Sequence, residues 1–314
     1  MYRPNVAKST HSAVSDDRNP NVQIFINGEF FPRDEAKISV FDSGFLVGDG
    51  IWEGIRLHKG KFAFLDRHLD RLFAGAKTLD IDIGTRDDIA SMLRATVQRN
   101  DMHDHVHVRL MITRGNKKTP SQHPSNVVGT PNIIIIAEHK KANPEVENEG
   151  ISLFTTTIRR PPPDSLDQKL NCHSKLHEVI ALVQAVHAGA DEALMLDPHG
   201  AVATCNATNF FIVRKGEVWT STGQYNLPGI TRALVLEVAR AAGIPAFEKN
   251  FSLTDVYDAD EVFVTGTFGG LTPVSSVDGR TIGAGSGRGP MTERLVGLYR
   301  EAIAKDAAEG ESVR

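Results

Sequence analysis

The sequence predicts a two-domain α+β protein, and three observations support this prediction. The chain has 314 residues, of which 40% are hydrophobic and 24% charged, a balance typical of globular proteins with room for more than one core. Segments with the periodicity of strands and of helices occur in both halves of the chain. A charged, Pro-containing segment without apolar periodicity (KKANPEVENEG, residues 140–150) separates the two halves.

These observations divide the chain into four parts. Residues 1–20 are polar and are expected to be mobile or to pack on a partner subunit. Residues 21–139 form a small domain, 140–150 the interdomain linker, and 151–314 a large domain. Strands and helices are mixed in both domains.

The charge and the cysteine count exclude several classes of protein. A formal charge of -4 argues against nucleic acid or an anionic membrane as the main partner. No apolar run approaches the roughly 20 residues that span a bilayer, and the first residues lack the apolar stretch of a signal peptide. The 2 cysteines, Cys172 and Cys205, make no disulfide framework. We therefore expect a cytoplasmic protein.

In the first half, Asn27-Gly28 between two apolar runs predicts a hairpin, because both residues tolerate positive φ. A Gly-punctuated stretch at 42–50 follows. Apolar residues at helical spacing predict helices over 66–79 and 86–100. The last predicted elements of this half are strands at 107–113 and 132–137.

The second half begins with a predicted strand at 151–157. A helix is expected over 174–188, with Leu176, Val179, Ile180 and Val183 facing inward and Gly189 ending it. The remaining predicted elements are strands at 192–196, 209–213 and 261–265, helices at 231–242 and 291–305, and tight turns at 198–200 and 278–279.

Two glycine-containing segments are candidate anion sites. Residues 227–232 (LPGITR) open a helix, where free N–H groups and the helix dipole suit a phosphate and Thr231 can add its hydroxyl. Residues 265–270 (TGTFGG) follow a buried strand and offer amides and a Thr hydroxyl. By themselves, these segments also fit a capped helix and a glycine-rich turn. Arg56, between apolar residues on a strand, needs either a ligand anion or a structural Asp partner.

Two other patterns are weaker. His103, His105 and His107 alternate and could face a zinc ion, but Asp101 and Asp104 indicate a solvated loop, so no metal site is expected. The glycines at 283, 285, 287 and 289 match neither the dinucleotide spacing nor a P-loop. They indicate a flexible turn.

Taken together and in this order, the segments resemble the class IV (fold type IV) pyridoxal-phosphate aminotransferases, the group of branched-chain and D-amino-acid aminotransferases. The matching stretches are 25–29 (FINGE), 41–56, 66–72 (DRHLDRL), 190–193 (ADEA), 209–211 (NFF), 227–232, 259–262 (ADEV), 265–274 and 277–279 (VDG). They extend over roughly residues 22–299. The resemblance implies a small N-terminal α/β domain, a larger C-terminal β-barrel-like domain, and a homodimer.

The resemblance also implies roles for particular residues. It places pyridoxal or pyridoxamine 5′-phosphate between the two domains. The positions that match the cofactor site are Arg56, Asn209, Gly229, Ile230, Thr231, Gly266 and Thr267. Phe45, Val47 and Arg109 match the substrate side, where Arg109 is a candidate partner for a carboxylate. Thr119 falls where the D-amino-acid enzymes carry a carboxylate-binding Arg, which argues against that subgroup.

The chain departs from the family at two positions. A count without gaps puts Asn171 at the Schiff-base lysine and Thr204 at the acid that pairs with the ring nitrogen. The lysine amine normally binds the cofactor and carries a proton, and the acid keeps the ring protonated. Asn has no basic amine and Thr has no full charge. We therefore expect a noncovalently bound cofactor and a weaker electron sink.

Two explanations of the missing lysine stay open. In one, a bulge moves the register by two residues and Lys169 is the Schiff-base lysine. In the other, the site lacks this lysine, and Lys175, His173, water or a substrate amine moves the proton. The gap-free count and the accompanying change at Thr204 favour the second explanation.

The expected function is that of a transaminase-type enzyme, which moves an amino group between an amine or amino acid and a 2-oxo acid. The same fold also hosts aminodeoxychorismate lyase, so a lyase is the enzyme alternative. A catalytically retired cofactor-binding protein is the alternative from another class.

Overall fold

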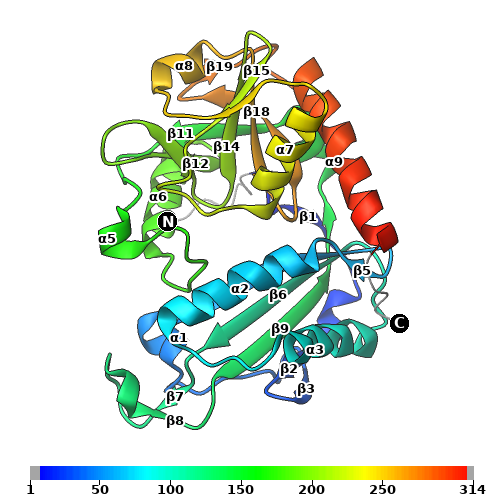
Figure 1. Ribbon diagram of the computed structural model, residues 1–314, viewed down its shortest axis with the longest axis vertical. Helices are drawn as coiled ribbons and strands as arrows, with labels where there is room; N and C mark the ends of the chain where they lie inside the picture. The colour runs from blue at the N-terminus through cyan, green and yellow to red at the C-terminus, as the bar shows by residue number, and fades with distance from the viewer. Residues whose placement is uncertain (1–7, 310–314) are drawn as a thin grey trace. The chain divides into compact units, whose positions relative to one another are not determined.

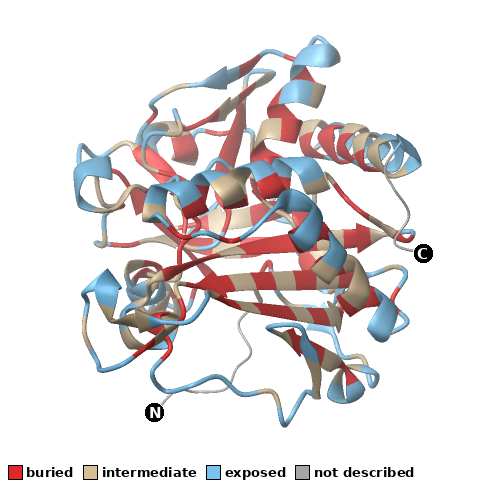
Figure 2. Cartoon of the chain, turned by 60° about the horizontal axis from the view of Figure 1, so that its bottom comes forward, coloured by how far each residue is buried: buried red, intermediate tan, exposed pale blue. Residues whose placement is uncertain are grey.

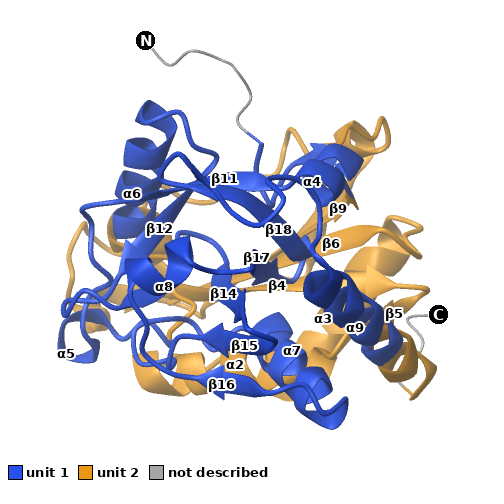
Figure 3. Ribbon diagram, turned by 90° about the horizontal axis from the view of Figure 1, so that it is seen from above, with its two compact units in different colours: residues 1–13, 142–169, 176–302 blue, residues 14–141, 170–175, 303–314 orange. Residues whose placement is uncertain are grey.

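The structure is a computed structural model that describes residues 8–309 and divides into two compact units, coloured separately in Figure 3. Unit 1 comprises residues 1–13, 142–169 and 176–302, and unit 2 comprises residues 14–141, 170–175 and 303–314. Residues 1–7, the start of the segment expected to be mobile, lie outside the described residues. The mixture of helices and sheets in both units confirms the α+β class (Figure 1).

Unit 2 is built on an antiparallel sheet whose strand order, within residues 8–309, is β3-β2-β9-β6-β4-β5. The strands are β2 (Gln23–Ile26), β3 (Glu29–Pro32), β4 (Gly50–His58), β5 (Lys61–Phe62), β6 (Val106–Thr113) and β9 (Asn132–His139). The predicted hairpin turn joins β2 and β3, with Asn27 at φ 52° and Gly28 at φ 98°. Both residues therefore have the left-handed backbone that this turn requires.

Helices α2 (Leu65–Leu79) and α3 (Arg86–Arg99) pack on one face of this sheet. The predicted apolar stripes hold, since Leu69, Leu72, Ile89 and Leu93 are all buried in the same core. Along β6, buried and half-buried residues alternate (Figure 2), so each strand presents a second set of side chains to the opposite face. That opposite face carries the candidate site described below.

Unit 1 is built on a larger mixed sheet. Its strand order among the described residues is β13-β12-β11-β18-β17-β14-β15-β16, with β19 paired to β18. The strands are β11 (Ile151–Thr155), β12 (Glu192–Leu196), β13 (Val202–Cys205), β14 (Asn209–Arg214), β15 (Glu217–Thr220), β16 (Ala246–Glu248), β17 (Glu261–Gly266), β18 (Gly270–Val277) and β19 (Arg280–Thr281). The β14–β17 pairing puts Asn209 opposite Thr265, which brings two separate predicted segments together.

The remaining elements lie outside these two sheets. The longer helices are α6 (Leu176–His187), α7 (Ile230–Ala241) and α9 (Pro290–Glu309). The short elements are β1 (Ala13–Val14), η1 (Asn19–Asn21), α1 (Ser43–Val47), β7 (Asn116–Lys117), η2 (Pro124–Asn126), β8 (Val127–Val128), β10 (Lys141–Ala142), α4 (Pro144–Glu149), α5 (Pro163–Leu166) and α8 (Leu253–Tyr257). No helix within residues 8–309 has the length and apolarity needed to cross a membrane.

The predicted inward face of α6 is wrong. Leu176, Val179 and Ile180 are 71%, 52% and 42% exposed, whereas Ala181 and Ala185 are fully buried. The two alanines belong to a small cluster with residues of β12, and small side chains allow a helix to lie close to a sheet. The buried face of α6 also includes the Glu178 carboxylate, whose Oε1 accepts a 2.9 Å hydrogen bond from Arg160 Nη1.

Helix extends into two segments where none was predicted. The charged segment 140–150 includes β10 and α4, where the Asn143 side chain accepts from the Glu145 N–H and caps the helix. At the other end of the chain, α9 continues four residues beyond the predicted end, to Glu309. There the Asp306 carboxylate accepts a 2.7 Å hydrogen bond from the Phe64 backbone N–H.

Candidate active site

Asn171 is held rigidly beside β4 in unit 2. The Trp52 N–H donates to the Asn171 carbonyl at 2.9 Å, and the His173 N–H donates to the Gly50 carbonyl at 2.9 Å. The Asn171 side-chain amide donates from Nδ2 to the Trp52 carbonyl at 2.7 Å. Asn171 is 5% exposed, and its Oδ1 is a buried atom without a hydrogen-bond partner among the described residues. Such an acceptor is uncommon in a folded protein and calls for a donor.

Trp52 connects Asn171 to Arg109. The Trp52 indole donates from Nε1 to the Cys172 carbonyl at 3.1 Å, and the Arg109 guanidinium carbon lies 3.8 Å from the Trp52 ring centroid. Arg109 has neither a hydrogen bond nor an ion pair with any residue in 8–309. Burial lowers the pKa of Arg109, but a guanidinium stays charged in a protein. A stacked, half-buried cation without a paired carboxylate is suited to binding an anion.

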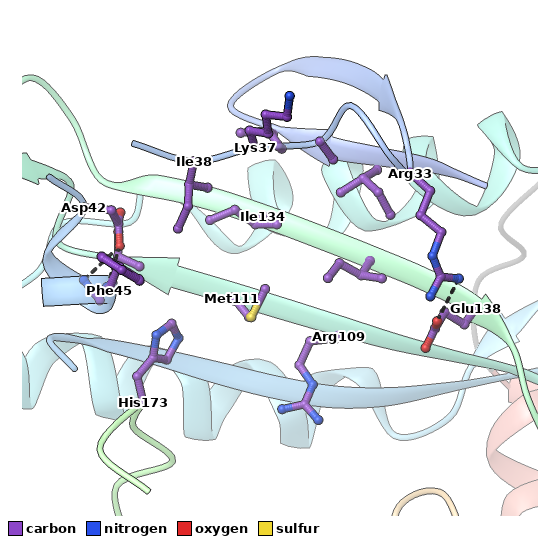
Figure 4. A pocket seen from close by; sticks show the side chains of 16 residues that line it. Arg33, Lys37, Ile38, Asp42, Phe45, Arg109, Met111, Ile134, Glu138 and His173 are labelled. Atoms are coloured by element: carbon purple, nitrogen blue, oxygen red, sulfur yellow. Dashed lines mark hydrogen bonds and ion pairs between the residues drawn. The ribbon is translucent and has the colours of Figure 1, made fainter. Parts of the chain in front are cut away.

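Arg109 lines a cavity of about 610 Å³ that lies within unit 2 (Figure 4). The apolar lining residues are Ile24, Ile26, Ala36, Ile38, Phe45, Met111, Ile134 and Ile136. At one end, Arg33 Nη1 pairs with Glu138 Oε1 at 3.3 Å. Of the predicted substrate-side residues, Phe45 and Arg109 line this cavity, whereas Val47 does not and is 40% exposed. The cavity is of a size that takes a small molecule.

A buried polar network positions Phe45 at the other end of the cavity. The Asp42 carboxylate caps α1 by accepting from the Gly44 and Phe45 N–H groups, and it also accepts from the Thr113 hydroxyl at 2.5 Å. A Cβ atom on Gly44 would lie 2.6 Å from Thr113 Cγ2. Only glycine therefore fits at position 44 without a shift of its neighbours.

His173 also lines the cavity. Its Nε2 lies 3.1 Å from the Ile51 carbonyl oxygen, so the hydrogen belongs on Nε2, and Nδ1 has a free lone pair. Burial lowers the pKa of His173. The imidazole is therefore neutral at neutral pH and can accept a proton.

Unit 1 brings several of the predicted cofactor residues together. Helix α7 begins after Gly229, which makes no side-chain capping hydrogen bond in the described part of the chain. The first N–H groups of a helix have no intrahelical partner. Asn209 Nδ2 donates to the Leu227 carbonyl at 3.0 Å, and a Cβ on Gly229 would lie 2.0 Å from Asn209 Oδ1. The Thr265 hydroxyl, opposite Asn209, is buried without a partner among the described residues.

The other predicted site residues differ in burial. Thr204 is 3% exposed, and its hydroxyl donates to the Thr208 carbonyl at 2.7 Å. This hydroxyl therefore has no second hydrogen to donate to a ligand. Lys169 is exposed, and Lys175 is half-buried. Arg56 is half-buried on β4 and makes no hydrogen bond or ion pair through its side chain within residues 8–309.

The predicted residues fall into two sets. Unit 2 holds Phe45, Val47, Arg56, Arg109, Asn171 and Lys175. Unit 1 holds Lys169, Thr204, Asn209, Gly229, Ile230, Thr231, Gly266 and Thr267. No group of three or more metal-ligating side chains occurs among residues 8–309, and the His107 ring lies against Gly54, 3.1 Å from an added Cβ.

A family model and the sequence relatives of this chain indicate the same protein family. A family model described as amino-transferase class IV matches residues 50–277. Branched-chain-amino-acid aminotransferase-like protein 2 of Arabidopsis thaliana is 42% identical over 286 residues, which are 90% of this chain and 50% of the relative. A putative branched-chain-amino-acid aminotransferase of Methanocaldococcus jannaschii is 37% identical over 90% of this chain and 97% of the relative. The chain spans about half the length of its Arabidopsis relatives.

A solved structure agrees with the sequence relatives. A T.th. branched-chain amino acid aminotransferase with pyridoxamine 5′-phosphate matches with a TM-score of 0.86 and 30% identity. The match covers 94% of this chain and 99% of the other, which confirms the predicted fold type IV architecture. With the family model matching most of the chain, the conclusion is that this protein belongs to the class IV aminotransferase family.

Proposed function

We propose that this chain is a pyridoxal- or pyridoxamine-phosphate-dependent transaminase. It would move an amino group between an amine or amino acid and a 2-oxo acid. The observation that carries the proposal is Arg109, a guanidinium stacked on Trp52 that lines the cavity and has no ion-pair partner among residues 8–309. Every 2-oxo acid brings a carboxylate, the anion that a guanidinium binds with two parallel hydrogen bonds.

The residues of unit 1 fit the phosphate of such a cofactor. The N-terminus of α7 lacks a capping side chain, and the buried Thr265 hydroxyl has no partner within residues 8–309. We propose that Gly229, Ile230, Thr231, Gly266 and Thr267 bind the phosphate through backbone N–H and hydroxyl groups, with Arg56 as the cation and Asn209 holding the segment before α7. When bound, pyridoxal phosphate supplies a carbonyl carbon for the amino group and a ring that takes up electron density.

We propose that the cofactor is bound noncovalently. Asn171 is buried and fixed by its backbone and side chain, whereas Lys169 is exposed. This contrast supports the explanation in which no lysine occupies the Schiff-base position. The neutral Thr204 hydroxyl would leave the ring nitrogen without a counter-charge.

We further propose that His173 moves the proton. Asn171 and His173 flank Cys172, which forms a bridge with Ile51, and residues two apart in an extended segment lie on the same side. The His173 Nδ1 has a free lone pair, because Nε2 donates to the Ile51 carbonyl. A half-buried, neutral imidazole is a suitable general base. Lys175 remains the alternative base.

The preferred substrate is proposed to have an apolar side chain. Seven aliphatic or thioether side chains line the cavity beside Arg109, which would bury a branched hydrocarbon chain favourably. The relatives named above carry branched-chain amino acids in their names. We therefore choose 4-methyl-2-oxopentanoate as the probe.

A homodimer is also proposed. Ile38, Val40, Phe41, Phe45 and Val47 are all at least 40% exposed in one short stretch of unit 2, and such clusters are typical of protein interfaces. Light scattering at micromolar concentration should give the dimer mass. A monomer would contradict this proposal.

A half-reaction tests the function. Protein loaded with pyridoxamine 5′-phosphate and mixed with 4-methyl-2-oxopentanoate should produce leucine, with one equivalent of the aldehyde cofactor appearing in the spectrum. The second candidate, a retired cofactor-binding protein, is favoured by Asn171 and Thr204, which lack the amine and the charge of the usual site. Tight cofactor binding with no amino-acid product from any 2-oxo acid would support that candidate and overturn the transaminase.

A further inference from the structure

The buried amide of Asn171 has a fixed orientation. An amide oxygen and nitrogen can be exchanged by a flip, but the Trp52 carbonyl can only accept a hydrogen bond. The NH₂ group must therefore face Trp52, at 2.7 Å, and Oδ1 must face away from it. The backbone contacts of Asn171 and His173 with β4 prevent the segment from turning. The site thus presents one oriented acceptor.

This acceptor is unsatisfied within the part of the chain that the structure describes. Asn171 is 5% exposed, and Oδ1 has no hydrogen-bond partner among residues 8–309. Burying an acceptor without a partner is unfavourable, because its hydration is lost and nothing replaces it. A ligand that brings an N–H donor would recover this free energy, whereas a ligand with a carbonyl oxygen at the same point would be repelled by Oδ1.

We infer that Asn171 is a specificity-determining residue that accepts a hydrogen bond from a primary ammonium group. The inference rests on the proposed function, because the two ligands that could bring this group are the amine form of the cofactor and an amino-acid substrate. The Arg109 guanidinium, stacked on the same Trp52 whose carbonyl holds Asn171, offers a site for the carboxylate that an amino acid carries beside its ammonium group. In this view, the Asn171 amide takes the place of the covalent bond that a lysine would form, because it binds the amine form of the cofactor selectively.

Matched ligand pairs separate the two sources. Pyridoxamine 5′-phosphate and 4-deoxypyridoxine 5′-phosphate share the ring and the phosphate and differ in the amino group. Leucine and 4-methylpentanoate form the corresponding substrate pair, measured on protein loaded with 4-deoxypyridoxine 5′-phosphate. Dissociation constants by calorimetry should favour the amine of at least one pair about tenfold or more, as expected for a hydrogen bond to a charged group.

Two variants test whether the tighter binding of the amine-bearing ligand depends on Asn171 Oδ1. Asn171→Leu keeps the shape and removes the acceptor, so the two members of the pair should bind equally. Asn171→Asp keeps an acceptor oxygen and should retain the preference. Each variant must also keep its folded site. The test is that its dissociation constant for 4-deoxypyridoxine 5′-phosphate stays within about threefold of that of the unsubstituted protein.

The outcomes are distinct. Amine preference in the cofactor pair assigns Asn171 to the cofactor, and preference in the leucine pair alone assigns it to the substrate. Suppose that pyridoxamine 5′-phosphate and 4-deoxypyridoxine 5′-phosphate both bind. Equal dissociation constants within each pair then overturn the inference and leave the proposed function standing. If neither pyridoxamine 5′-phosphate nor 4-deoxypyridoxine 5′-phosphate binds, the proposed function is wrong, and the inference that rests on it is wrong as well.

Discussion

At the scale of single residues, the proposed noncovalent attachment of the cofactor depends on position 171. Asn171 is buried and held by the Trp52 carbonyl. Asn171→Lys should restore a primary amine there, and borohydride reduction with pyridoxal phosphate should leave a pyridoxyl group at position 171. Peptide mapping by mass spectrometry measures it. The unsubstituted chain, treated in parallel, should carry no stoichiometric label, and a full label on Lys169 would instead support the shifted register.

The proposed binding of a substrate carboxylate depends on Arg109. Arg109→Met keeps a long apolar side chain over Trp52 and removes the charge, so the KM for 2-oxo acids should rise about 10- to 100-fold, the effect of losing one charge-assisted pair. The dissociation constant of pyridoxamine phosphate should stay unchanged. Arg33→Met is the matched control, because Arg33 lines the same cavity but is paired with Glu138. An equal rise in KM in both variants would contradict the role of Arg109.

At the scale of elements, α6 separates what a sequence pattern can predict from what it cannot. Leu176, Val179 and Ile180 have the spacing of a core stripe, yet the structure buries Ala181 and Ala185 instead. Periodicity identifies a stripe, but not the surface that covers it. By contrast, the hairpin at Asn27-Gly28 and helices α2 and α3 were predictable, because their turn residues and apolar stripes agree with the local packing.

The orientation of α6 can be tested by a pair of substitutions. Ala185→Leu adds bulk at a fully buried position and should lower the free energy of unfolding by about 1–3 kcal/mol. Val179→Thr changes a residue that is 52% exposed and should alter it by no more than about 0.5 kcal/mol. Denaturant titration of both variants gives the comparison. The opposite ranking would mean that the apolar stripe is the buried face.

At the scale of the whole molecule, the sequence predicted the family-like order of segments but not the contacts between distant strands. The β4–β6 register, which puts Gly54 opposite Arg109 and lets the guanidinium reach the Trp52 ring, has no local signal. The pairing of Asn209 with Thr265 is of the same kind. Long-range register depends on how sheets assemble, so Arg109 could be predicted as a site residue and Trp52 as its partner could not.

The response of the whole chain to acid includes a contribution from three buried or half-buried histidines. Burial lowers the pKa of His58, His139 and His173 below the ordinary value of about 6.5. As the pH falls through that value, the unfolded chain binds protons before the folded one, so the stability present at pH 7–8 is progressively lost. Glu192 opposes this trend, because burial raises its pKa and acid favours its folded form.

We therefore expect the three histidines to contribute a lower free energy of unfolding at pH 5.5 than at pH 7.5. His173→Gln, whose amide can still donate to the Ile51 carbonyl, should reduce the difference between the two pH values. His187→Gln, at an exposed position in the last turn of α6, should leave it unchanged. Urea titrations at both pH values measure this, and an undiminished difference in His173→Gln would show that burial of this imidazole contributes nothing to the acid sensitivity.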